Sequence, residues 1–152
     1  MDRTLLIVYH SQSGNTEQLS QAVEQGALGE KSVTVRRLPA CAVTAEELCN
    51  CRALVICSPE YFGYMAGAVK DMFDRTYEQV RPKMLGKSYT IVVSAGNDGS
   101  GALASIERIV AGFKLKKVQE PVVSRGAVLE EALAKCRELG QTLAAGMAFG
   151  IY

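Results

Sequence analysis

Residues 4–16 read Thr4-Leu5-Leu6-Ile7-Val8-Tyr9-His10-Ser11-Gln12-Ser13-Gly14-Asn15-Thr16. The first six residues are an apolar run without alternation, as in a strand that is buried on both faces of a parallel sheet. The segment Ser11–Thr16 offers hydroxyl and amide donors beside a glycine, and it leads directly into a helical pattern. Because main-chain N–H groups at a helix N-terminus bind anions, this stretch predicts a buried strand, an anion-binding loop and a helix.

Alternation of strand and helix continues outward from this unit. Gly26 and Gly29 are the expected stops of the first helix. The alternating, more polar run Ser32–Arg36, which we expect to end before Pro39, predicts an edge strand. Further strands are expected at 53–58, 89–94 and 118–123, and further helices from Thr44, from near Ala66, around 103–113 and over 129–147.

Five βα units predict an α/β fold, a three-layer sandwich with a parallel sheet and helices on both faces. Two strand orders remain open at this point, a flavodoxin-like order 2-1-3-4-5 and a truncated Rossmann order. In either order, ligands bind where the carboxyl ends of the strands meet a switch in direction. The loops after strands one, three and four therefore matter most.

Length and charge narrow the class of protein. A chain of 152 residues fits one domain, 1–152. Its formal net charge of +1 supplies no field that would attract nucleic acid or an anionic membrane. No apolar run approaches the roughly 20 residues of a spanning helix, and no signal-peptide pattern follows Met1, so we expect a cytoplasmic protein.

The cysteines and the single histidine predict no metal site. Five cysteines occur without a C-x-x-C pair, and His10 is the only histidine. Cys57 falls in a predicted strand and Cys136 in the apolar stripe of the last helix. We therefore expect free thiols, with Cys57 and Cys136 in the core, and assign no catalytic side chain.

The loop after the first strand has the chemistry of a mononucleotide site. Gly14 allows a sharp turn towards a ligand, and the loop has no lysine, so neutral donors would hold a phosphate. A Walker A loop would need Gly-Lys-Ser/Thr, and a dinucleotide site would need G-x-G-x-x-G. Neither pattern is present. The predicted phosphate-binding residues are Ser11, Gln12, Ser13, Gly14, Asn15 and Thr16.

Two further loops complete the predicted site. The loop after strand three carries aromatic residues beside a glycine, which suits a flat apolar ring that also needs main-chain donors. Its candidates are Pro59, Glu60, Tyr61, Phe62 and Gly63. The loop after strand four carries no aromatic residue and would leave one face of such a ring open. Its candidates are Ala95, Gly96, Asn97, Asp98 and Gly99, of which Asn97 and Asp98 serve equally well as turn formers.

These motifs resemble those of flavodoxin-like FMN-binding proteins. The loop Ser11–Thr16 is similar to their phosphate loop T/S-x-T/S-G-N-T, and residues 59–74 are similar to a run in the flavodoxin-like NAD(P)H:quinone oxidoreductases. The segment Ser58-Pro59-Glu60-Tyr61 resembles, more loosely, a loop of the NADPH-dependent FMN reductases. The resemblance implies the 2-1-3-4-5 order and FMN as the cofactor.

The resemblance implies two functions that share one cofactor. In the first, an oxidoreductase takes electrons from NAD(P)H and passes them to a quinone, a flavin or another small acceptor. In the second, an electron carrier shuttles between redox protein partners and has no NAD(P)H site of its own. The Phe62-Gly63-x-Met65 segment and the near-neutral charge favour the enzyme, and the short chain opposes it. The preference for NADH or NADPH, and the formation of a homo-oligomer, stay open.

Two carboxylates stand near the predicted ring. Glu60 and Asp98 would oppose extra negative charge on a reduced flavin by like-charge repulsion and so lower its reduction potential. We therefore expect Glu60→Gln to raise that potential.

Overall fold

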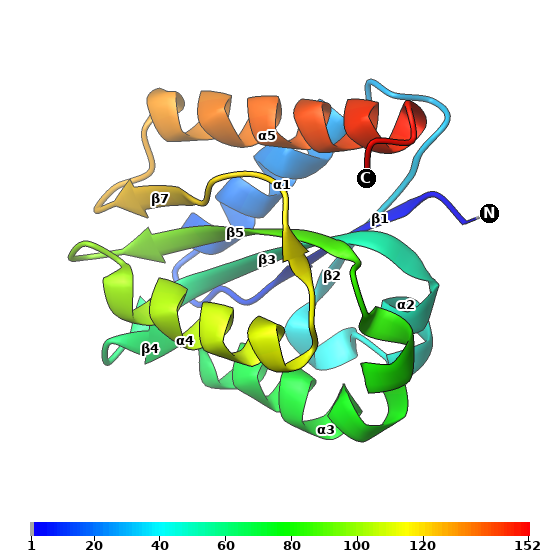
Figure 1. Ribbon diagram of the computed structural model, residues 1–152. Coiled ribbons are helices and arrows are strands. Elements are labelled where there is room, and N and C mark those ends of the chain that lie inside the picture. The colour runs from blue at the N-terminus through cyan, green and yellow to red at the C-terminus, as the bar shows by residue number, and fades with distance from the viewer. Residues whose placement is uncertain (1) are drawn as a thin grey trace.

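The computed structural model describes residues 2–152 as a central sheet between two layers of helices (Figure 1). The strands follow the order β2-β1-β3-β5-β6, and β7 also pairs with β5, so the predicted 2-1-3-4-5 path is confirmed. The strands are β1 (Thr4–Tyr9), β2 (Thr34–Pro39), β3 (Cys51–Tyr61), β4 (Tyr64–Met65), β5 (Ser88–Ala95), β6 (Lys116–Lys117) and β7 (Val122–Arg125). The helices are α1 (Asn15–Ala27), η1 (Ala40–Ala42), α2 (Ala45–Asn50), α3 (Gly67–Met84), α4 (Ser100–Gly112) and α5 (Glu130–Ala148).

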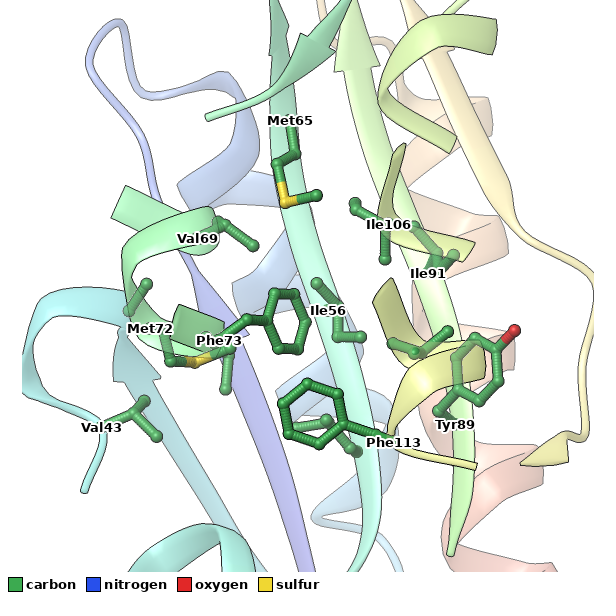
Figure 2. Close-up of a cluster of buried hydrophobic side chains, with 14 of the residues drawn as sticks. Val43, Ile56, Met65, Val69, Met72, Phe73, Tyr89, Ile91, Ile106 and Phe113 are labelled. Carbon is green, nitrogen blue, oxygen red and sulfur yellow. The ribbon is translucent and has the colours of Figure 1, made fainter. Parts of the chain in front are cut away.

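Each face of the sheet has its own apolar cluster. Helices α1 and α5 cover one face, and α2, α3 and α4 cover the other (Figure 1). On the second face Phe73 and Phe113 lie 5.4 Å apart between their ring centroids and pack over Ile56 (Figure 2). Burial on both faces explains why β1, β3 and β5 read as continuous apolar runs.

The start of α2 follows its sequence signal closely. The Thr44 hydroxyl accepts a hydrogen bond from the Glu47 N–H, and the Glu47 carboxylate accepts one from the Thr44 N–H. This reciprocal capping box stabilises a helix of only six residues.

Two predicted boundaries near the edge of the sheet are wrong. Strand β2 begins two residues later than predicted and includes Pro39, which pairs with Tyr9. A proline is tolerated there because β2 is an edge strand, which has no neighbour on its outer side. Gly26 lies inside α1 and does not stop it. A side chain at Gly26 would come within 1.9 Å of the Arg137 carbonyl oxygen, so this glycine allows α1 and α5 to cross closely.

The sheet holds seven strands and is not purely parallel, which corrects the predicted five-stranded parallel sheet. Strand β3 continues through Pro59, Glu60 and Tyr61, which we expected in a loop, and pairs antiparallel with β4. The turn between them has φ of 54° at Phe62 and 69° at Gly63, the positive values of a tight two-residue hairpin turn. Such a turn is hard to foresee when an aromatic residue takes the first position.

The last strand, predicted at 118–123, is found as two short strands: β6 lies before that range, and β7 begins only at Val122. Both pair with β5 in parallel, at its first two and last four residues respectively. Between them Pro121 lacks an N–H for the ladder, and the Gln119 carbonyl oxygen accepts from the Thr90 hydroxyl at 2.9 Å. The split moves the carboxyl end of the strand to Arg125, next to Ala95 of β5.

Candidate functional site

A pocket of about 220 Å³ opens where β1, β3, β5 and β7 end. It brings together three of the predicted loops and one segment from after β7. The residues that line it are Ser13, Asn15, Pro59, Glu60, Tyr61, Ser94, Ala95, Gly96 and Gly126. Residues that are up to 113 positions apart in the chain thus meet at the switch point of the sheet, where α/β folds bind ligands.

The predicted phosphate loop forms the entry to α1. Gly14 has φ of 98° and caps the helix, and the Gly14 N–H donates to the Ser11 hydroxyl at 3.0 Å. A side chain added at Gly14 would meet nothing within 4 Å, so a ligand has open access to this backbone. The N–H groups in the first turn of a helix have no acceptors within the helix, and Asn15, the first residue of α1, lines the pocket. Gln12 is exposed and lies outside the pocket lining.

The hairpin β3–β4 packs against the first turns of α4. The Glu60 carboxylate accepts from the Ala102 N–H at 3.0 Å, and the Ser105 hydroxyl accepts from the Met65 N–H at 3.0 Å. At Gly101, a side chain would come within 2.0 Å of the Gly63 carbonyl oxygen. These contacts fix the position of the hairpin tip.

At that tip, Phe62 is fully exposed and does not line the pocket, and neither does Gly63. Tyr61 does line it, and its ring meets the His10 ring edge-on at 6.1 Å between centroids. The pocket wall at this side is therefore Tyr61 with Pro59, and Phe62 extends beyond it.

Of the loop after β5, the first part lines the pocket and the second part forms a turn that leads into α4. Ala95 and Gly96 line the pocket, and Ala95 is the last residue of β5. The Asp98 carboxylate accepts from the N–H and the hydroxyl of Ser100, and these hydrogen bonds hold the pKa of Asp98 below its usual value. Gly99 is the N-cap residue of α4 and has φ of 72°. Asn97, Asp98 and Gly99 do not line the pocket, so Asp98 has the geometry of a turn former.

Two pocket residues were missed by the sequence analysis, Ser94 and Gly126. Ser94 was not named among the site candidates, although a polar residue at the carboxyl end of a buried strand is a signal that could have found it. Its hydroxyl lies 2.7 Å from the Thr16 hydroxyl, and both residues are buried. Gly126 follows β7, and its N–H donates to the Ala95 carbonyl oxygen at 2.8 Å. No signal pointed to it, because the split of the last strand was not foreseen.

In residues 2–152, no three His, Cys, Asp or Glu side chains cluster in a way that could hold a metal ion. Over the same residues, no helix combines the length and the apolarity needed to cross a membrane. The described cysteines are all free, and Cys57 and Cys136 are buried as expected.

Comparison with known proteins decides the family. Residues 36–129 match the family model described as NADPH-dependent FMN reductase, which covers more than half of the chain. The chain belongs to this family of flavodoxin-like FMN-binding proteins. The matched segment includes every residue that lines the pocket except Ser13 and Asn15, and it excludes the loop Ser11–Thr16.

Relatives that are 26% to 28% identical to this chain include a flavodoxin and a quinone dehydrogenase. A flavodoxin of Aquifex aeolicus (strain VF5) is 26% identical over 92% of this chain and 84% of its own length. An NAD(P)H dehydrogenase (quinone) of Paracoccus denitrificans (strain Pd 1222) is 28% identical over 68% of this chain and 59% of its own length. The match thus spans under two thirds of that dehydrogenase.

Solved structures support the fold alone. A flavodoxin from the domain Archaea superposes with a TM-score of 0.81 at 21% identity, covering 95% of this chain and 99% of that one. Rubredoxin oxygen:oxidoreductase from Desulfovibrio gigas superposes with a TM-score of 0.84 at 17% identity, covering 98% of this chain and 37% of that one. The flavodoxin-like fold is therefore confirmed.

Proposed function

We propose that residues 1–152 form one flavodoxin-like domain that holds FMN non-covalently and passes electrons from NAD(P)H to a small acceptor such as a quinone or a flavin. The phosphate would lie on the loop Ser11–Thr16, and the ring would lie between Pro59–Gly63 and Ala95–Gly99. The observation that carries the proposal is the pocket in which Ser13 and Asn15 meet Pro59, Tyr61 and Ala95.

The donor set fits a phosphate monoester. The first turn of α1 offers N–H groups without acceptors in the helix, and the open side of Gly14 lets a ligand approach them. The positive end of the helix dipole favours an anion there without any lysine or arginine in the pocket lining. At this end of the pocket, main-chain N–H groups and the neutral side chains of Ser13 and Asn15 would hold the phosphate.

The remainder of the pocket fits part of a flat ring. Pro59, Tyr61 and Ala95 supply apolar surface, and the adjoining main chain supplies donors and acceptors. A volume of about 220 Å³ is below the roughly 300–1,000 Å³ of usual ligand pockets. A bound mononucleotide would therefore extend outward, towards the hairpin tip with Phe62.

The protein contributes binding and electrostatics to the reaction. FMN, when bound, supplies transfer of one or two electrons, which protein side chains do not provide. Glu60 lines the pocket as a carboxylate and disfavours extra negative charge beside it. The absence of an aromatic residue from the loop 95–99 leaves room for a hydride donor or an acceptor to approach.

A second function is an electron carrier without an NAD(P)H site. Two observations favour it: the flavodoxin of Aquifex aeolicus matches over 92% of this chain, and the match to the quinone dehydrogenase of Paracoccus denitrificans covers only 59% of that protein. Parts of that enzyme's length thus have no counterpart in the aligned region.

One experiment separates the two functions. The protein is loaded with FMN, its visible spectrum is recorded, and it is mixed anaerobically with NADH or NADPH. Bleaching of the flavin absorbance far faster than for free FMN supports the oxidoreductase. Bound flavin that neither nucleotide bleaches, but that a chemical reductant reduces in two separate one-electron steps, supports the carrier. A protein that takes up no FMN contradicts both functions.

A further inference from the structure

A groove with apolar walls and two cations lies between the carboxyl ends of α3 and α4, with a volume of about 440 Å³. It lies just before the start of β5, whereas the pocket proposed for FMN lies at the end of that strand. Within the described part of the chain, no carboxylate lines this groove. Its apolar lining residues are Tyr77, Pro82, Leu85 and Phe113, and its charged lining residues are Arg81 and Lys114.

The apolar lining of the groove is partly open to solvent. The Tyr77 ring meets the buried Phe113 ring edge-on at 5.0 Å between centroids, which gives the groove a firm floor. Leu85, the C-cap residue of α3, is 70% exposed. Exposed apolar surface with a polar rim is typical of a site where another molecule binds.

Arg81 is held in place, but its charge is not neutralised. Its guanidinium carbon lies 5.9 Å from the centroid of the Tyr77 ring, and the face of an aromatic ring attracts a cation. Arg81 Nε lies 3.8 Å from Glu78 Oε2, and the two side chains are 57% and 80% exposed. So long and exposed an ion pair contributes little, which leaves the guanidinium available to another carboxylate.

Lys114 occupies a backbone position that favours glycine. The Lys114 N–H donates to the Ala111 carbonyl oxygen at 3.0 Å, and the Leu115 N–H donates to the Val110 carbonyl oxygen at 3.1 Å. These two bonds form a Schellman motif, and Lys114 takes its left-handed position with φ of 58°. A side chain is strained there, and Lys114 forms no ion pair within residues 2–152 that would offset the strain.

From this arrangement we infer that the groove binds an acidic segment of another protein. A large apolar side chain of that segment lies against Tyr77 and Leu85, and its carboxylates meet Arg81 and Lys114. Two cations without a carboxylate favour an acidic occupant, and tyrosine and arginine are the residues that most often dominate protein interfaces.

Two other occupants fit the groove less well. The exposed Leu85 forms a wall too open to enclose a small molecule. A second copy of this chain, bound about a two-fold axis through the groove, would bring the same cations of both copies together. A partner segment bound here leaves the pocket at the other end of β5 free, so this inference does not depend on the proposed function.

Selection of peptides tests which chemistry the groove prefers. A phage library of random peptides is selected on the immobilised wild-type protein, and an enriched peptide is synthesised with a fluorescent label. We expect enriched sequences to combine a large apolar residue with several acidic ones. The dissociation constant of the labelled peptide, measured by fluorescence anisotropy, should be the same with and without added FMN.

Exposed residues of the groove provide the variants. Arg81→Glu should weaken peptide binding about tenfold or more, because a carboxylate there repels the acidic segment. Leu85→Ala should weaken it about fivefold, because the apolar contact is lost. Lys135→Glu is the matched control, because it changes the net charge equally on α5, which covers the other face of the sheet. It should leave the affinity within about twofold.

Lys114→Gly separates binding from stability. Glycine relieves the strain at φ of 58°, so the midpoint of urea denaturation should not fall. Peptide binding should nevertheless weaken about threefold, because one charged contact is lost. A lower midpoint with unchanged binding would show that Lys114 serves only the end of α4, where the helix dipole favours a cation.

Several results would overturn the inference. They are the absence of any enriched peptide, enriched sequences without acidic residues, and an affinity that Arg81→Glu leaves unchanged. Sedimentation that shows a wild-type dimer, which Arg81→Glu converts to a monomer, would also overturn it, since a second copy would then cover the groove. None of these results bears on FMN binding, which titration with FMN tests separately.

Discussion

Glu60 contacts both the pocket and a helix end. It lines the pocket, and its carboxylate accepts from the Ala102 N–H in the first turn of α4. A negative charge near the N-terminus of a helix is stabilised by the helix dipole, so the carboxylate stays fixed where a ligand would approach it. A cofactor bound in this pocket would therefore lie beside a carboxylate of fixed position.

Replacing this charge should shift the potential of the bound flavin. Glu60→Gln keeps an oxygen for the Ala102 N–H and removes the repulsion, so the midpoint potential should rise by on the order of tens of millivolts. Redox titration of the FMN-loaded protein measures it. Glu107→Gln is the control, because Glu107 lies further along α4 and pairs with Lys117. An unchanged midpoint in Glu60→Gln would contradict the role of this charge.

Burial keeps the core thiols protonated. It raises the pKa of Cys51 from an ordinary 9.0 to about 11, while the unfolded thiol ionises near 9. Between these values the unfolded chain has released a proton that the folded chain keeps, so the free energy of unfolding falls as the pH rises from about 9 to about 11. Denaturant titrations at pH 8, 9 and 10 should show a smaller fall in Cys51→Ala than in wild type. An equal fall of the free energy of unfolding with pH in the two proteins would refute this effect of Cys51.

Residue patterns predicted the turn at Gly14 well and the conformation of the aromatic segment less well. The turn at Gly14 was expected because few other residues accept a positive φ, and its φ of 98° confirms it. The conformation of Phe62 was not foreseen, because an aromatic residue rarely adopts a φ of 54°. The contacts of Ser94 with Thr16 could not be predicted, because they depend on how β5 lies beside α1 in three dimensions.

At the scale of elements, glycines set how closely neighbouring segments approach. Gly26 and Gly140 lie at the crossing of α1 and α5, and Gly101 lies where α4 meets the hairpin. In each place an added side chain would meet main-chain atoms, which cannot move away as a flexible side chain would. These contacts join segments that are distant in sequence, so local patterns do not reveal them. For that reason Gly26 was predicted to stop the helix, although it serves the contact with α5.

The crossing of α1 and α5 should tolerate no side chain. Gly140→Ala would place a methyl group 2.0 Å from the Val23 carbonyl oxygen, so we expect a loss of about 1–3 kcal/mol in the free energy of unfolding. Urea denaturation measures it. Gly112→Ala, at a helix position with nothing within 4 Å, should be neutral or slightly stabilising. Equal stability of the two variants would show that the crossing is not tight.

The position of the hairpin β3–β4 should depend on the absence of a side chain at Gly101. Gly101→Ala would place a methyl group 2.0 Å from the Gly63 carbonyl oxygen and displace the tip. If the segment Pro59–Gly63 holds the flavin ring, affinity for both FMN and riboflavin should fall several-fold, because the two ligands share that ring. The two losses should be similar, because the phosphate loop is not changed. Fluorescence titration of both ligands measures this. Gly67→Ala, at the start of α3 with nothing within 4 Å, is the control. Unchanged affinities in Gly101→Ala would exclude the hairpin from the site.

At the scale of the whole molecule, the sequence predicted the architecture because β1, β3 and β5 are buried on both faces. That burial leaves continuous apolar runs, and their alternation with helices yields the order confirmed here. The split of the last strand could not be read, because Pro121 and the side-chain contact to Gln119 interrupt it only in the folded chain. The position of Gly126 in the pocket depends on that split.

The central claim is that FMN binds at the carboxyl edge of the sheet with its phosphate at the N-terminus of α1. Fluorescence titration of the apoprotein with FMN tests it, with Asn15→Asp as the probe, because a carboxylate at the first position of α1 would repel the phosphate. We predict saturable binding of one FMN per chain and a loss of at least about tenfold in Asn15→Asp, with riboflavin binding unchanged. No FMN binding by the wild-type protein, or equal FMN affinity in Asn15→Asp, would contradict the claim.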